Sequence, residues 1–148
     1  HEDAFAAYKW LVENGGSLNA DSKRVAVAGE SAGGNLAANV ALMATKNRIT
    51  EPVPQLLVYP VAGSDMETAS YKENQSTVPL SAKDMAWFVK EALPSKADAK
   101  DERIDLVDRQ DLAGVAPASG LLVPTIVARS AKRPTAGSTA MRGSWSTG

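Results

Sequence analysis

The sequence of 148 residues contains no cysteine and only one histidine, His1. The absence of cysteine excludes disulfides and thiolate metal sites, and cysteine usage therefore does not indicate whether the protein works in an oxidising or a reducing compartment. No segment approaches the roughly 18 apolar residues that a membrane-spanning helix needs. The formal net charge of −1 gives no electrostatic reason to expect nucleic acid or an anionic membrane as a partner. These absences favour a globular protein, for which we expect a cytoplasmic location.

The composition is that of an ordinary domain up to about residue 128 and changes beyond it. Apolar residues make up 44% of the chain and charged residues 22%, which is typical of soluble proteins. We therefore expect one domain over residues 1–128. Residues 129–148 contain no leucine, isoleucine, valine or acidic residue, so they are predicted to form a disordered tail. The change is abrupt enough to suggest a shift of reading frame near residue 129.

Apolar spacing predicts alternating helices and strands. The expected helices cover residues 2–13, 32–46 and a short stretch around 85–89, and the expected strands cover 24–28, 55–60 and 121–128. Ser81 and Asp84 form a predicted capping box at the start of the short helix. The polar residues 61–80 are expected to be a loop, and the charged residues 95–111 a solvated surface segment. The order strand, helix, strand predicts an α/β fold with a parallel sheet core and flanking helices.

One motif in the sequence indicates a catalytic residue. Gly29-Glu30-Ser31-Ala32-Gly33 has the Gly-x-Ser-x-Gly pattern and stands between a predicted strand and a predicted helix. This placement is typical of a nucleophile elbow, a sharp turn that exposes a serine hydroxyl to substrate. Ser31 is the candidate nucleophile, and the backbone N–H of Ala32 is the candidate donor to an oxyanion. At Gly29 and Gly33 we expect neighbouring backbone to approach closely, which the absence of a Cβ allows.

Two other interpretations of this turn stay open. It could be a glycine-rich connection with an incidental serine. A phosphate-binding loop is less favoured, because Gly29 to Gly34 lacks both Gly-Lys-Ser/Thr and Gly-x-Gly-x-x-Gly. A serine nucleophile also needs a base. His1 is expected to be exposed and without a catalytic role, and the last carboxylate, Asp111, precedes the third predicted strand.

Several blocks, in order along residues 1 to about 128, resemble one family. They are Glu2-Asp3-Ala4 through Trp10, Gly29 through Ala38, Leu56 through Pro60, Ser70 through Asn74, the segment around Trp87-Phe88, Asp111 through Gly114, and Pro117-Ala118. Together they resemble the bacterial esterases of the hormone-sensitive-lipase-like group, family IV of the α/β hydrolases. The resemblance implies a partial α/β-hydrolase fold that hydrolyses small-molecule carboxylic esters through an acyl-enzyme on Ser31, without a cofactor or metal.

The chain departs from the family pattern at both ends. The family's His-Gly-Gly-Gly oxyanion loop belongs upstream of residue 1, and Arg129 through Arg133 stand where an Asp-Pro-Leu-like turn should supply the catalytic acid. No histidine follows His1. The first residues are also neither a start methionine nor a basic signal peptide. We therefore expect an internal fragment that lacks the N-terminal strands and the C-terminal catalytic part, and that is inactive alone.

Two alternatives to an esterase remain. The chain could be a non-catalytic α/β-hydrolase-like protein that binds an apolar ligand or a partner protein. It could also be another acyl-transfer enzyme with the same elbow, such as a thioesterase, peptidase or acyltransferase, because the fold hosts many chemistries. The sequence does not indicate the oligomeric state.

Overall fold

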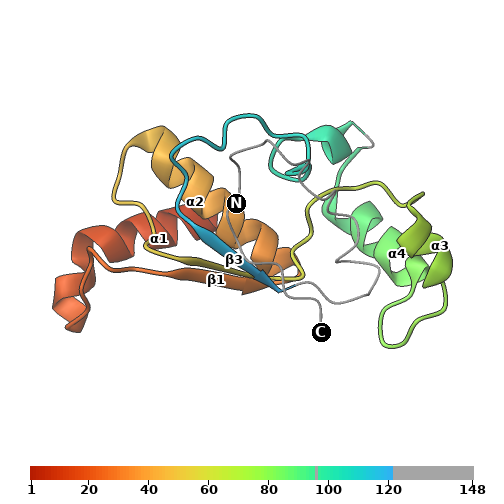
Figure 1. Cartoon of the computed structure of the whole chain (residues 1–148), viewed down its shortest axis with the longest axis horizontal. Helices are drawn as coiled ribbons and strands as arrows, with labels where there is room; N and C mark the ends of the chain where they lie inside the picture. The colour runs from red at the N-terminus through yellow and green to blue at the C-terminus, as the bar shows by residue number, and fades with distance from the viewer. Residues whose placement is uncertain (96, 122–148) are drawn as a thin grey trace.

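Three short parallel strands form the centre of the computed structural model, which describes residues 1–95 and 97–121 (Figure 1). In chain order the elements are α1 (Glu2–Asn14), the 3-10 helix η1 (Gly15–Leu18), β1 (Val27–Glu30), α2 (Ala32–Asn47), β2 (Gln55–Val58), α3 (Ala69–Glu73), α4 (Ala82–Ala92), the 3-10 helix η2 (Asp98–Lys100) and β3 (Ala118–Leu121).

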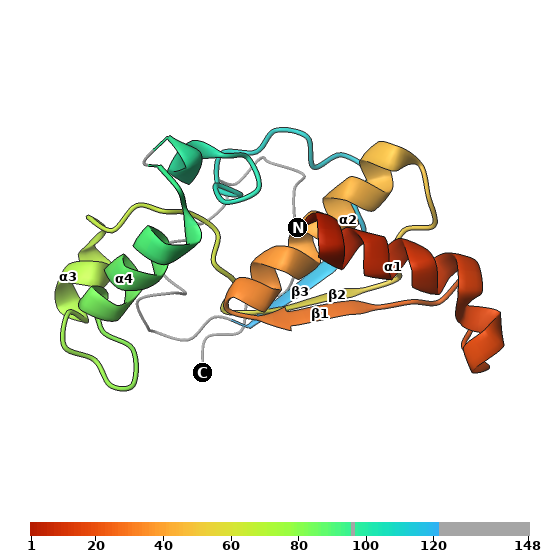
Figure 2. The ribbon, with the colours of Figure 1, turned by 180° about the vertical axis from the view of Figure 1, so that it is seen from behind.

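The sheet has the order β1-β2-β3 with all strands parallel. Both α1 and α2 lie on the same side of it, and α3 and α4 lie beyond its carboxyl end, as the two opposite views show (Figures 1 and 2). On the other side, the register partners Ala28, Leu56 and Ser119 are exposed. The predicted α/β class, with a parallel sheet and flanking helices, is confirmed.

Small side chains let α2 pack closely against the sheet. Ala41 and Ala44 are completely buried, and Ala37 and Ala38 pack against Leu57 of β2. Tyr8 attaches α1 to this helix by packing against Val40 and Ala44. Its hydroxyl donates to the Thr50 carbonyl oxygen at 2.7 Å, and burial raises its pKa, helped by the charge of Glu51.

The predicted strands are displaced from the observed ones. The expected strand 24–28 starts too early, because the Arg24 N–H is turned onto the Asp21 carbonyl and the strand itself begins at Val27. The expected strand 55–60 ends at Val58, since Tyr59 has φ of 33° and Pro60 has no N–H to donate. The predicted helices 2–13 and 32–46 are confirmed within a residue.

Two further differences concern the second half of the chain. The expected loop 61–80 contains α3, whose start is capped by the Thr68 side chain. The third strand begins at Ala118 rather than at residue 121. Backbone pairing to β2 holds it, and Ala118 packs against the buried cluster that contains Leu57. The rest of that prediction, residues 122–128, and the predicted tail 129–148 lie outside the described residues.

Within residues 1–95 and 97–121, every helix is too short or too polar to cross a lipid bilayer.

The capping box of α4 gives a test of the fold. The Ser81 hydroxyl accepts from the Asp84 N–H, and the Asp84 carboxylate accepts from the Ser81 N–H and hydroxyl. Loss of such a cap destabilises a protein by about 1 kcal/mol. We expect Ser81→Ala to lower the free energy of unfolding by that amount at neutral pH, as measured by urea denaturation.

Acid should reduce this difference. The hydrogen bonds from Ser81 hold the Asp84 pKa below its ordinary value of 3.8. The resulting stabilisation is therefore fully present above the unfolded-state pKa and is lost as the pH falls through the lower folded-state pKa. An equal effect of Ser81→Ala at neutral pH and well below the folded-state pKa would contradict the capping interpretation.

Candidate active site

Ser31 lies at the junction between β1 and α2 with an unusual backbone conformation. Its φ is 55° and its ψ is −119°, a region that residues with a side chain rarely occupy and that costs about 1–3 kcal/mol. The residue stands at the N-cap of α2, yet its hydroxyl makes no capping hydrogen bond, and the side chain is half-exposed. The turn thus holds a serine hydroxyl that the helix start does not use.

Four backbone hydrogen bonds hold Ser31 in this conformation. Its N–H donates to the Val58 carbonyl oxygen at 3.0 Å, at the end of β2. Its own carbonyl oxygen accepts from the N–H groups of Gly34 at 3.1 Å, Asn35 at 3.2 Å and Val61 at 3.0 Å. Both peptide units around Ser31 are therefore fixed by neighbouring elements.

Glycine is needed at two positions around the turn, because other atoms of the chain fill the space that a side chain would take. A Cβ on Gly29 would lie 2.0 Å from the Gly33 carbonyl oxygen, and one on Gly34 would lie 2.9 Å from the Pro60 Cβ. Gly33 has nothing within 4 Å of such an atom. The expected close approach is confirmed at Gly29 and wrong at Gly33. The second position without room for a Cβ is Gly34, and the pair Gly33-Gly34 at the end of the motif was a signal for it.

Ala32 begins α2 and is exposed. The first N–H groups of a helix have no partner within the helix, and the helix dipole makes that end favourable for negative charge. No acidic side chain occupies the first turn of α2. The start of α2 can therefore donate to an anion that forms beside Ser31.

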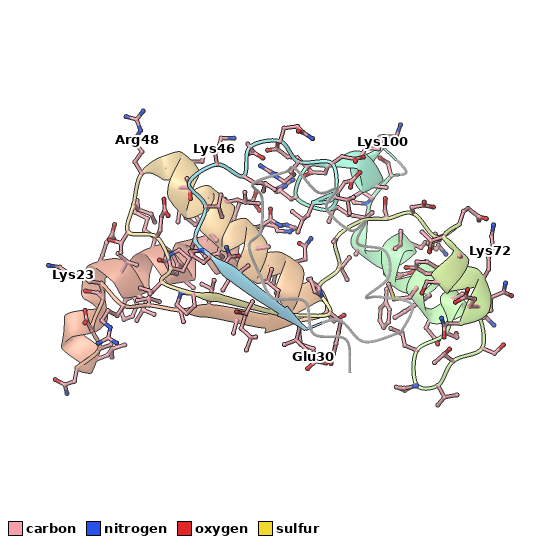
Figure 3. All side chains as sticks on the ribbon, in the orientation of Figure 1. Lys23, Glu30, Lys46, Arg48, Lys72 and Lys100 are labelled. Atoms are coloured by element: carbon pink, nitrogen blue, oxygen red, sulfur yellow. The ribbon has the colours of Figure 1, made fainter. Side chains whose placement is uncertain are left out.

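Tyr59 and Glu30 form a pair at the same end of the sheet. Tyr59 follows β2 with φ of 33°, and Glu30 ends β1 directly before Ser31. Hydrogen bonding to the Glu30 carboxylate raises the pKa of the Tyr59 phenol, and partial burial and the negative charge add to this shift. Figure 3 labels Glu30 at this carboxyl end, where ligands bind in open α/β sheets.

A buried amide network supports the first turns of α2. The Asn35 side-chain amide donates to the carbonyl oxygens of Val61 at 2.8 Å and Arg103 at 2.9 Å. The Asn39 amide donates to the Arg103 carbonyl oxygen at 2.9 Å and to the Asn35 side-chain oxygen at 3.1 Å. Sequence reasoning missed this network, although Asn35 and Asn39, one turn apart among the small and apolar residues in the first part of α2, were a signal.

His1 does not occupy the exposed position expected of it. The ring is half-buried, and its Nε2 lies 2.7 Å from the Asn35 Oδ1. Because the Asn35 Nδ2 points at two carbonyl oxygens, its Oδ1 must face the histidine, so Nε2 carries the proton and donates. The hydrogen bond of this nitrogen therefore goes to Asn35 rather than to Ser31. That His1 has no catalytic role stays a prediction.

The charged segment 95–111 is only partly solvated, so that expectation is wrong in part. The Arg109 side chain is 6% exposed and pairs with Asp111 and Glu102. Arg103 hydrogen-bonds Asp101 and lowers the pKa of that carboxyl to about 2. The contact with Arg109 likewise lowers the Asp111 pKa. These carboxylates are thus committed to arginines of their own segment.

Two shallow hollows lie apart from Ser31. One is lined by residues of α3 and α4 and the loops beside them, including Met66, Tyr71 and Lys83. The other lies on the charged segment between Lys100 and Asp111. Over the part of the chain that the structure describes, no group of three or more histidine, aspartate or glutamate side chains could hold a metal ion.

Known proteins share both the sequence and the fold. A family model described as the alpha/beta hydrolase fold matches residues 1–123. The ethyl acetate hydrolase of Pseudomonas putida is 32% identical over 122 residues, covering 82% of this chain and 38% of that protein. The carboxylic ester hydrolase LipN of Mycobacterium tuberculosis is 37% identical over 123 residues, covering 79% of this chain and 33% of that protein.

One further relative is named as a receptor and not as an ester hydrolase. The gibberellin receptor GID1C of Arabidopsis thaliana is 33% identical over 100 residues, covering 66% of this chain and 29% of that protein.

Among solved structures, a thermostable esterase from Pseudomonas putida ECU1011 superimposes with a TM-score of 0.82 at 32% identity, covering 88% of this chain and 42% of that one. The chain thus spans less than half the length of these proteins.

The two glycines of the motif give a matched test of the turn. A Cβ at Gly29 would overlap backbone, and overpacking typically costs about 1–3 kcal/mol and occasionally more. At Gly33 a Cβ meets open space inside a helix, where alanine is more favourable than glycine by up to about 1 kcal/mol. Urea denaturation should therefore show Gly29→Ala strongly destabilised and Gly33→Ala unchanged or stabilised. Equal losses at both positions would contradict the described turn.

Proposed function

This chain belongs to the α/β hydrolase fold family, and on that basis we propose that the complete polypeptide carrying it is a carboxylic ester hydrolase with Ser31 as nucleophile. The observation that carries the proposal is the conformation of Ser31. A strained φ held by four backbone hydrogen bonds, with a half-exposed hydroxyl left out of the helix cap, favours a role in chemistry over a role in folding.

The proposed reaction has two stages. The Ser31 Oγ attacks the carbonyl carbon of the ester, and the oxygen that becomes negative accepts a hydrogen bond from the Ala32 N–H. The tetrahedral intermediate then expels the alcohol and leaves an acyl group on Ser31. Water releases the carboxylic acid in the second stage. An oxyanion donor of this kind typically contributes about 3–4 kcal/mol to transition-state stabilisation.

A base must take the proton from Ser31, and the described hydrogen bond of the His1 ring goes to Asn35, not to the Ser31 hydroxyl. The catalytic histidine and aspartate are expected from the family resemblance rather than from this chain. We therefore expect the 148 residues alone to be inactive. A small-molecule ester as substrate fits the names of the esterase relatives, and residues 1–128 as the hydrolase part, like the cytoplasmic location, stay predictions.

The second candidate is a non-catalytic binding protein. A specific observation favours it, namely that one relative covering 66% of this chain is named as a receptor. The two functions differ in one chemical property, the reactivity of Ser31. A fluorophosphonate probe reacts with activated serines, so a complete, folded polypeptide that is not labelled would favour the binding function.

Ser31→Ala tests the proposal in the complete polypeptide. Removal of the nucleophile should abolish fluorophosphonate labelling and lower kcat for a p-nitrophenyl ester by about 10⁴-fold or more. The control is Ser17→Ala, since Ser17 is exposed and its hydroxyl only donates to the nearby Asn14 carbonyl. Retained hydrolysis in Ser31→Ala, with the wild type active, would assign the chemistry to another residue.

A further inference from the structure

Val61 is the link between Ser31 and a buried side chain. Its N–H donates to the Ser31 carbonyl oxygen at 3.0 Å, and its own carbonyl oxygen accepts from the Asn35 Nδ2 at 2.8 Å. Asn35 also holds Ser31 directly, because its backbone N–H donates to the same Ser31 oxygen at 3.2 Å. One residue thus holds the Ser31 carbonyl by two routes.

The Asn35 side chain has only one arrangement that satisfies its surroundings. Its two amide hydrogens go to the carbonyl oxygens of Val61 and Arg103, at 2.8 and 2.9 Å. Its Oδ1 accepts from the His1 Nε2 at 2.7 Å and from the Asn39 Nδ2 at 3.1 Å. The residue is 5% exposed. A reversed amide would place oxygen against two carbonyl oxygens, so burial fixes the orientation.

We propose that Asn35 is a positioning residue for Ser31, an inference that rests on the proposed function. The φ of 55° at Ser31 is not one that serine adopts readily, so external contacts must maintain it. Release of Val61 removes one of the three hydrogen bonds on the Ser31 carbonyl and frees the loop after β2. The backbone then relaxes, the Cα–Cβ bond turns, and the hydroxyl leaves its attacking position.

Asn39 provides the matched control. It lies one turn further along α2, is 2% exposed, and donates to the Arg103 carbonyl oxygen at 2.9 Å as Asn35 does. Its described hydrogen bonds go to Asn35 and Arg103, not to Val61 or Ser31. Loss of the Asn39 side chain therefore disturbs the same buried network without releasing the Ser31 turn.

The experiment compares Asn35→Ala and Asn39→Ala in the complete polypeptide, with rates divided by the folded fraction from thermal melting. Misplacement of reacting groups by about 1 Å can lower rates 100-fold. We expect Asn35→Ala to lower both the fluorophosphonate labelling rate of Ser31 and kcat by about 10- to 100-fold, with KM within about threefold. Asn39→Ala should lower Tm but leave the labelling rate within about threefold of wild type.

Each outcome decides a different question. Equal losses in the two variants, or losses that follow the folded fraction alone, overturn the positioning role. A folded wild type that neither reacts with the probe nor hydrolyses esters overturns the proposed function instead. If Asn35→Ala does not fold, Asn35→Asp replaces it, because aspartate keeps the shape of the side chain and lacks its two amide donors. The same comparison with Asn39→Ala then decides.

Discussion

The contact between Gly29 and the backbone of Gly33 sets the geometry on which the rest of the site depends. The last turn of the chain before α2 is so tight that the Gly33 carbonyl occupies the volume of a Gly29 side chain. Gly34 lies close to Pro60 after β2, although less tightly, since a Cβ there would be 2.9 Å from the Pro60 Cβ. With β1 and α2 this close, the one residue between them must reverse the chain direction sharply. Ser31 does so by taking a positive φ.

Hydrogen bonds then stabilise that conformation of Ser31. Peptide groups of β2, the loop after it and the first turn of α2 all meet at Ser31. The buried amide of Asn35 extends the same support to the Arg103 carbonyl oxygen, 68 positions away in sequence, to which Asn39 also donates. Burial of unpaired amides would be costly, about 1–3 kcal/mol for each group left unsatisfied. The described residues leave no buried side-chain polar atom unsatisfied, so the network supports the turn without that cost.

The sequence predicted those parts of the fold that depend on local patterns. Apolar spacing located α1 and α2 within a residue, and the Ser81–Asp84 pair located the start of α4. The motif placed Ser31 between a strand and a helix. Strand ends were less predictable, because Arg24 is held in a turn and Tyr59 leaves the sheet through backbone conformation rather than side-chain type. Ala118 packs against the buried cluster that contains Leu57, but Ser119 and Gly120 join the sheet through backbone pairing, so this segment carries little apolar signal. The Asn35 network unites residues far apart in sequence, and only the folded chain brings them together.

Under the role proposed for Ser31, its strained backbone sets stability against reactivity at a single position. Glycine tolerates a positive φ without the steric penalty that serine suffers, so Ser31→Gly should relieve strain while it removes the hydroxyl. Selection for thermal robustness alone would thus tend to erase this serine, as happens where active sites and stability compete. Serine at position 31 thus keeps a hydroxyl in the turn at a cost in folding free energy.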